Sequence, residues 1–173
     1  WILDIILRYA LAVAVVLIIP IFYFIFKPLT FYPVFGLLKI FYNVSLDGLS
    51  TLTVNNYVIN FVEACIAGSA YSLLLLLNIL TPKLSFKKRV AIFLFGAGLL
   101  LLMNIARLTT LITLLINFPL SFNFVHKLWW YGLSTLFVAG IWIFSVYLFE
   151  IKSVPVLSDV IRIGKNISVK FSD

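Results

Sequence analysis

Charged side chains are scarce in this sequence. Only 11% of the 173 residues are charged, whereas 64% are hydrophobic, and the mean hydropathy is +1.17. Soluble domains are about half apolar and about a quarter charged, so these values exclude that class and predict an integral membrane protein. The net charge of +7 does not indicate nucleic-acid binding, because the basic residues lie mostly in short segments between apolar runs.

Reactive side chains are scarce as well. The chain has one cysteine, Cys65, and one histidine, His126. A single cysteine cannot form an internal disulfide, and one cysteine with one histidine cannot hold a metal ion. The sequence also lacks a glycine-rich phosphate loop, a Gly-x-Ser-x-Gly elbow and a pair of carboxylates among its six acidic residues. We therefore expect no metal and no cofactor, and cysteine acyl chemistry is the one reaction class that the residues support.

Four apolar runs are long enough to cross a hydrocarbon core of about 30 Å, which takes about 20 helical residues. They are residues 5–26, 61–80, 90–116 and 128–149. The second run ends before Pro82 and the third before Pro119, because proline and the residue before it disfavour a helix. The sequence predicts an all-α integral membrane protein, a four-span helical bundle that forms a single domain over residues 1–150.

The basic residues predict the orientation of this bundle. The loop between the second and third runs carries Lys83, Lys87, Lys88 and Arg89, and the tail 151–173 carries Lys152, Arg162, Lys165 and Lys170. The loops on the other side carry only Lys27, Lys39 and Lys127. By the positive-inside rule, we expect a multi-pass protein of the cell membrane with both termini and the tail in the cytoplasm.

The first outer segment, residues 27–60, divides into two parts. Residues 31–42 have an apolar face broken by Gly36 and Lys39, which predicts a helix that lies in the interface or packs on the bundle. Residues 47–60 begin with the turn signal Asp-Gly and are rich in Ser, Thr, Asn, Val and Ile. They predict a short extended ribbon that leads toward the cysteine.

Arg107 lies inside the third apolar run, where a charge costs a few kcal/mol and needs a partner. Asn104 stands three residues earlier, so both side chains share a helix face and Asn104 is predicted to orient Arg107. Glu63 is a candidate to tune or pair with either cation. A purely structural Arg107, paired or reaching the interface, is the open alternative.

The cysteine, the arginine and the histidine are predicted to reach the same leaflet. At about 1.5 Å per helical residue from the outer helix ends, Cys65 lies about 6 Å deep, Arg107 about 13 Å deep, and His126 at the mouth. An imidazole can take the proton of a thiol, and a guanidinium can stabilise an acyl oxyanion or bind a substrate carbonyl or carboxylate. The alternative for each is an ordinary packing or interfacial residue.

These residues resemble the exosortase and archaeosortase family of multi-span membrane proteins. The resemblance rests on residues 64–68 (Ala-Cys-Ile-Ala-Gly) at the outer start of a span, residues 104–107 (Asn-Ile-Ala-Arg) inside the next, and His126 before the last. It covers residues 46–150. Members more often have Ala-Cys-Ser-Gly around the nucleophile, so Gly68 stands one position later here.

The resemblance implies a cysteine protease and transpeptidase with Cys65 as the nucleophile, Arg107 as the transition-state or substrate-binding arginine and His126 as the third catalytic residue. Its substrates would be membrane-anchored proteins with a C-terminal sorting signal, which is cleaved at the outer face. The cleaved protein would pass to a membrane lipid or another acceptor, and nucleic acid is not a partner.

A second hypothesis comes from a different class of protein. In a non-catalytic membrane subunit, scaffold or small-solute carrier, Arg107 binds an anion or a partner helix and Cys65 only fills space. Polar residues of the second and third runs could then line a path or join helices by hydrogen bonds. They are Ser69, Ser72, Asn78, Thr109, Thr110 and Thr113.

Overall fold

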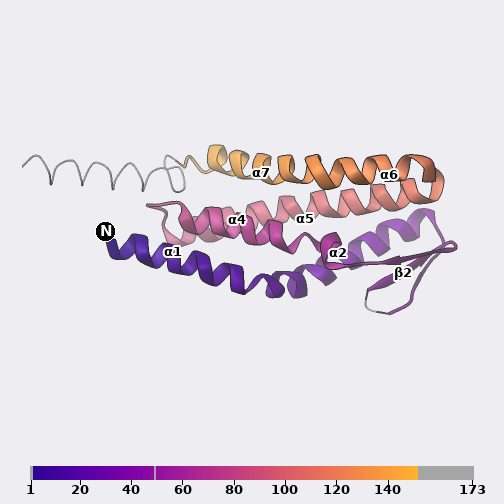
Figure 1. Ribbon diagram of the computed structural model, residues 1–173, viewed down its shortest axis with the longest axis horizontal. Coiled ribbons are helices and arrows are strands. Elements are labelled where there is room, and N and C mark those ends of the chain that lie inside the picture. Colours follow the sequence, from indigo (N-terminus) through magenta and orange to yellow (C-terminus); the bar gives the residue numbers. More distant parts are fainter. Residues whose placement is uncertain (1, 49, 152–173) are drawn as a thin grey trace, which may run out of the picture.

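The computed structural model describes residues 2–48 and 50–151, and the tail from residue 152 onward lies outside them (Figure 1). Most of the described chain is helical, and one small β-sheet follows the second helix. The elements are α1 (Ile2–Leu17), α2 (Ile19–Phe41), β1 (Val44–Leu46), β2 (Thr51–Val54), β3 (Tyr57–Asn60), α3 (Glu63–Ile66), α4 (Gly68–Leu80), α5 (Phe86–Asn117), α6 (Pro119–Leu128), the π-helix η1 (Trp129–Leu133) and α7 (Ser134–Leu148).

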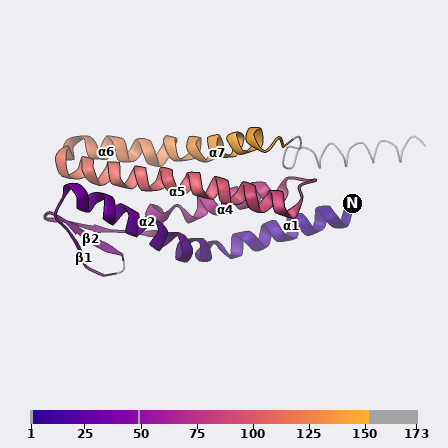
Figure 2. The same cartoon turned by 180° about the vertical axis from the view of Figure 1, so that it is seen from behind.

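The helices are arranged in three layers. α1 and α2 lie along one side, α4 and α5 lie in the middle, and α6 with α7 lies along the other side (Figures 1 and 2). α5 contacts α2, α4, α6 and α7, so it is the central helix of the bundle. Both ends of the described chain lie at one end of the bundle, and the β-sheet lies toward the opposite end (Figure 1).

The first predicted span is divided in the structure. α1 ends at Leu17 and α2 begins at Ile19, with Ile18 between them in a non-helical conformation. Pro20 explains the break, because its ring removes a donor and clashes with the carbonyl group four residues earlier.

The helix predicted for residues 31–42 is present and packs on the bundle, but it is not a separate element. α2 runs on through Pro28 and Pro33 to Phe41, so this segment is the last part of a long helix. Phe31, Val34 and Leu38 are buried on one face of it, which α2 packs against α5. The continuous buried face holds the helix together where two prolines remove main-chain hydrogen bonds.

The extended ribbon predicted for residues 47–60 is confirmed, and β1 adds a third antiparallel strand to it in the order β1-β2-β3. The turn between β1 and β2 contains Gly48 with φ +112°, a conformation that favours glycine. Leu52 and Val54 of the central strand are fully buried, so the sheet is anchored by one apolar face.

Within the described residues, three helical runs are long and apolar enough to cross a membrane. They are Ile19–Phe41, Phe86–Asn117 and Pro119–Leu148, the last comprising α6, η1 and α7. The apolar helices Ile5–Leu17 and Gly68–Leu80 are shorter than a full span. The membrane character of the chain therefore has structural support, whereas the predicted count of four spans is not confirmed.

The end of α4 at the basic loop is closed by two arginines. Arg8 of α1 is buried and donates to the main-chain oxygen of Leu80 at 3.1 Å. Arg89 of α5 donates to three further carbonyl oxygens within residues 78–81, and the side chain of Asn78 donates to the main-chain oxygen of Arg89 at 2.7 Å. The last carbonyl groups of α4 thus receive guanidinium donors, which also suit the negative end of the helix dipole.

Candidate active site

Cys65 lies in a single helical turn that the chain separates from the next helix. α3 ends at Ile66, Ala67 adopts the left-handed conformation with φ 58° and ψ 34°, and α4 begins at Gly68. A non-glycine residue in this conformation costs roughly 1–2 kcal/mol. The second predicted span is therefore two helices, and the break turns the cysteine away from the axis of α4.

Gly68 is required by the close approach of α2. A Cβ atom at this position would lie 2.7 Å from two ring carbons of Tyr23 and 2.9 Å from a third. The absence of a side chain lets the Tyr23 ring pack on the start of α4, which fixes the break beside Cys65 against α2.

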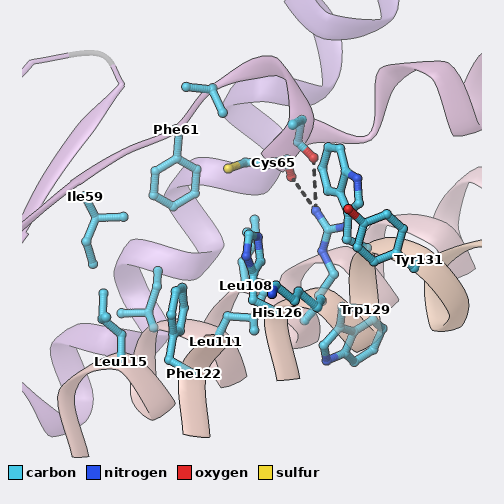
Figure 3. A pocket seen from close by; sticks show the side chains of 16 residues that line it. Ile59, Phe61, Cys65, Leu108, Leu111, Leu115, Phe122, His126, Trp129 and Tyr131 are labelled. Atoms are coloured by element: carbon cyan, nitrogen blue, oxygen red, sulfur yellow. Dashed lines mark hydrogen bonds between the residues drawn. The ribbon is translucent and has the colours of Figure 1, made fainter. Parts of the chain in front are cut away.

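Two buried side chains of α5 hold the cysteine turn by its main chain. Asn104 Nδ2 donates to the Cys65 carbonyl oxygen at 2.8 Å. Arg107 Nη2 donates to the carbonyl oxygens of Ala64 at 3.2 Å and Cys65 at 3.4 Å (Figure 3, dashed lines). Asn104 is fully buried and Arg107 is 7% exposed. The partner that Arg107 needs in an apolar helix is thus the α3 main chain.

Asn104 and Arg107 therefore share a helix face, as their spacing predicted, but they meet on a common target. Within the described residues, no hydrogen bond joins the two side chains. Glu63 is exposed, and it forms no ion pair with Arg107 or His126 in the part of the chain that the structure describes. It instead lines a separate cavity of about 490 Å³ together with Lys27.

A third contact of Arg107 reaches the π-helix. Nη1 donates to Ser134 Oγ at 3.4 Å, and Ser134 Oγ donates to the Trp129 carbonyl oxygen at 2.7 Å. Ser134 thus links the guanidinium to η1, the turn that carries three aromatic residues. Ser134 was not predicted as a site residue, although a hydroxyl inside an apolar run, directly after Trp-Trp-Tyr-Gly-Leu, is a signal for it.

The three predicted catalytic residues line one cavity of about 500 Å³, which we call the Cys65 cavity (Figure 3). In Figure 3 the Cys65 sulfur lies beside the Phe61 ring, across from Leu111 and Phe122. One wall comes from the chain after β2, and the other from α5, α6 and η1. Its lining is Ile59, Phe61, Val62, Ala64, Cys65, Arg107, Leu108, Leu111, Ile112, Leu115, Phe122, His126, Lys127, Trp129, Trp130 and Tyr131.

His126 is presented to this cavity by an aromatic stack. Its side chain is exposed, and its ring lies parallel to that of Phe122 with centroids 5.4 Å apart and 6.4 Å from the Trp130 ring. No hydrogen bond joins it to Cys65 among the described residues. The imidazole and the thiol thus line the same cavity without a hydrogen bond between them.

The charge of the Cys65 cavity has one sign. Arg107 and Lys127 contribute positive charge to its lining, and none of the described residues that line it is acidic. No group of three or more His, Cys, Asp or Glu side chains that could hold a metal ion occurs among the described residues. The cavity therefore combines a thiol, an imidazole and fixed positive charge within apolar walls.

Comparisons with known proteins add no relative: no family model, no curated protein and no solved structure matches this chain.

Proposed function

We propose that this protein is a membrane-embedded cysteine protease and transpeptidase that resembles the exosortases and archaeosortases. One observation carries the proposal. The only cysteine and the only histidine of the chain, together with a buried arginine of the central helix, line a single cavity although they come from three different parts of the sequence.

The first half-reaction is an acyl transfer to sulfur. Cys65 passes its proton to His126, and the thiolate adds to the carbonyl carbon of the scissile peptide bond. The positive charge of Arg107 stabilises the oxyanion that forms. The C–N bond then breaks, the amine leaves with the proton from His126, and the acyl group remains on Cys65 as a thioester.

The second half-reaction releases the acyl group to an acceptor. A hydroxyl or amine group, on a membrane lipid or another acceptor, attacks the thioester and gives up its proton through His126. The C–S bond breaks and the Cys65 thiol is restored. Water in place of the acceptor gives simple hydrolysis, so one site accounts for both protease and transpeptidase activity.

The site would work at the outer face of the cell membrane. The cavity is lined by residues of β3, α3, α5, α6 and η1. α6 and the β-sheet lie at the end of the bundle opposite to the described chain ends and the basic loop before α5 (Figure 2). With that basic loop and both termini in the cytoplasm, as the positive-inside rule predicts, the cavity opens outward. Secreted proteins anchored by a C-terminal sorting signal then meet the thiol after translocation.

A non-catalytic membrane subunit is the competing function, and one observation favours it. The hydrogen bonds of Arg107 go to protein atoms, namely the α3 main chain and Ser134, so the guanidinium has a structural use already. In that case the cavity holds a partner segment and Cys65 is an unreactive part of its wall.

The test compares the C-termini of membrane-anchored proteins in cells that produce the parent protein or Cys65→Ala. The proposal expects processing to stop completely in the variant while the protein still inserts, because the thiol is the nucleophile. Unchanged processing would end the catalytic assignment. As a control for reactivity, a membrane-impermeant alkylating reagent should label Cys65 from outside at neutral pH, and His126→Ala should slow that labelling.

A further inference from the structure

The strand that leads to Cys65 has a free edge. β3 lies at one side of the sheet and pairs only with β2 among the described strands. In the register, Val54 faces Tyr57 across a two-residue loop and Leu52 faces Ile59. Such a loop makes the closing pair hydrogen-bonded, and bonding then alternates along the strand.

This alternation determines which main-chain groups point away from the sheet. Tyr57 and Ile59 exchange hydrogen bonds with β2, so the N–H and C=O groups of Val58 and Asn60 point toward the free edge. Val58 is 67% exposed, and Asn60 is exposed as well. Two donor and acceptor pairs therefore stand about 7 Å apart along an open edge.

The strand with the free edge borders the Cys65 cavity through Ile59. Ile59 and Phe61 line the cavity on the same wall as Cys65, and the chain passes directly from β3 into the α3 turn (Figure 3). Leu115 and Phe122 of the helices lie across from them. The Cys65 cavity thus forms an apolar groove that runs from Ile59 of β3 to Cys65.

We propose that the substrate polypeptide binds as an added strand on the free edge of β3, which delivers its scissile bond to Cys65. This proposal rests on the proposed function and names how the same site takes its substrate. The main-chain groups of Val58 and Asn60 provide affinity that does not depend on sequence, and alternate side chains of the peptide enter the apolar groove.

The chemistry of the groove selects an extended peptide as the occupant. Alternating donors and acceptors at strand spacing match the main chain of another strand, whereas an acyl chain offers no partner for them. The positive charge of Arg107 and Lys127 disfavours lysine and arginine in the bound segment. The basic part of a sorting signal must then lie outside the groove.

The other edge of the sheet provides a matched control. Ser45 of β1 faces Thr53 and is hydrogen-bonded, so the main-chain groups of Leu46 also point to a free edge. β1 contributes no residue to the Cys65 cavity. A proline at an outward-facing position removes a free N–H without breaking a ladder bond. Val58→Pro and Leu46→Pro are thus equivalent changes on opposite edges.

The probe is the tripeptide reagent acetyl-Ala-Val-Ala chloromethyl ketone, with iodoacetamide as the reagent without a peptide. Each forms a C–S bond to the thiolate and expels halide, and Cys65 is the only cysteine that can react. With the purified full chain, we expect Val58→Pro to slow labelling by the peptide reagent about 5-fold, as for the loss of one hydrogen bond, and Leu46→Pro to leave it unchanged. Labelling by iodoacetamide should not change in either variant.

A second measurement uses the parent protein alone, so it does not depend on the folding of any variant. Two further peptide reagents carry an N-methyl group, one on the central amide and one on the neighbouring amide. Because alternate amides of an added strand face β3, only one of the two should label Cys65 more slowly than the unmethylated peptide. Equal rates for all three peptides, or equal losses in both proline variants, would overturn the added strand. Slow labelling by iodoacetamide that ignores His126→Ala is the distinct result that overturns the proposed function.

Discussion

At each end of the α3–α4 segment, one arginine and one asparagine donate side-chain hydrogen bonds to main-chain oxygens. At the end near the basic loop, the Arg89 side chain of α5 donates to the Thr81 carbonyl oxygen that follows α4. The Asn78 side chain of α4 donates to the main-chain oxygen of Arg89. At the end near the β-sheet, Arg107 and Asn104 donate to carbonyl oxygens of the α3 turn. Each asparagine is buried, and each donates to a main-chain oxygen at 2.7 or 2.8 Å.

The two ends differ in what lies beside the arginine. Arg89 closes a helix terminus, where its charge suits the helix dipole. Arg107 lies inside the apolar helix α5, donates to carbonyl oxygens of the single turn α3, and borders a cavity that holds a thiol. The same hydrogen-bonding chemistry thus gives a structural clamp at one end and a positively charged cavity wall at the other.

The largest expected effect separates the two arginines. Arg107→Lys should lower transpeptidation per folded protein about 100-fold or more, because an ammonium group cannot reproduce the planar guanidinium contacts or its charge placement. Arg89→Lys should leave that rate unchanged and lower only stability. The measurement is processing of anchored proteins in cells, normalised to inserted protein. Equal losses in both variants would mean that Arg107 is a structural clamp like Arg89.

The two asparagines give a smaller contrast. Asn104→Ala and Asn78→Ala each remove one donor to a buried carbonyl group, so each should lower the free energy of unfolding by about 1–2 kcal/mol. Only Asn104→Ala should alter alkylation of Cys65, by a few-fold, because it loosens the turn that carries the thiol. Thermal unfolding in detergent and the iodoacetamide rate measure the two effects separately. An altered rate in Asn78→Ala would show that general loosening explains both.

The sequence predicted those features that depend on the kinds of side chain and their spacing. The apolar runs indicated a helical membrane protein, Asp47-Gly48 marked the turn of the ribbon, and the spacing of Asn104 and Arg107 placed them on one face. It did not predict that their target is the main chain of α3, because a carbonyl oxygen has no signature in the sequence. Among the described residues, Arg107 forms no ion pair with Glu63, and it donates to this main chain instead.

Local rules also failed where packing between distant segments decided the outcome. Pro28 and Pro33 would normally end a helix, but the buried face of α2 continues through them to Leu38. The break at Ala67 was likewise not visible, because alanine favours a continued helix and the left-handed conformation is rare for it. The break at Ile18 is a third difference between the predicted spans and the observed helices. A fourth is the last span, which was predicted to begin at residue 128, whereas the helix begins at Pro119 with α6.

The smallest expected effect concerns Ala67, the strained residue that follows the α3 turn carrying Cys65. Ala67 holds φ 58°, where glycine has no steric penalty. Ala67→Gly should raise the free energy of unfolding by roughly 0.5–1 kcal/mol, since relief of strain exceeds the added entropy of the unfolded chain. Lys83→Gly, at φ 60° in the loop after α4, is the matched change at the other end of the segment. Both should stabilise, and neither should change the alkylation rate of Cys65, because the αL backbone at Ala67 is retained. A faster or slower thiol in Ala67→Gly alone would instead show that the strain itself positions the nucleophile.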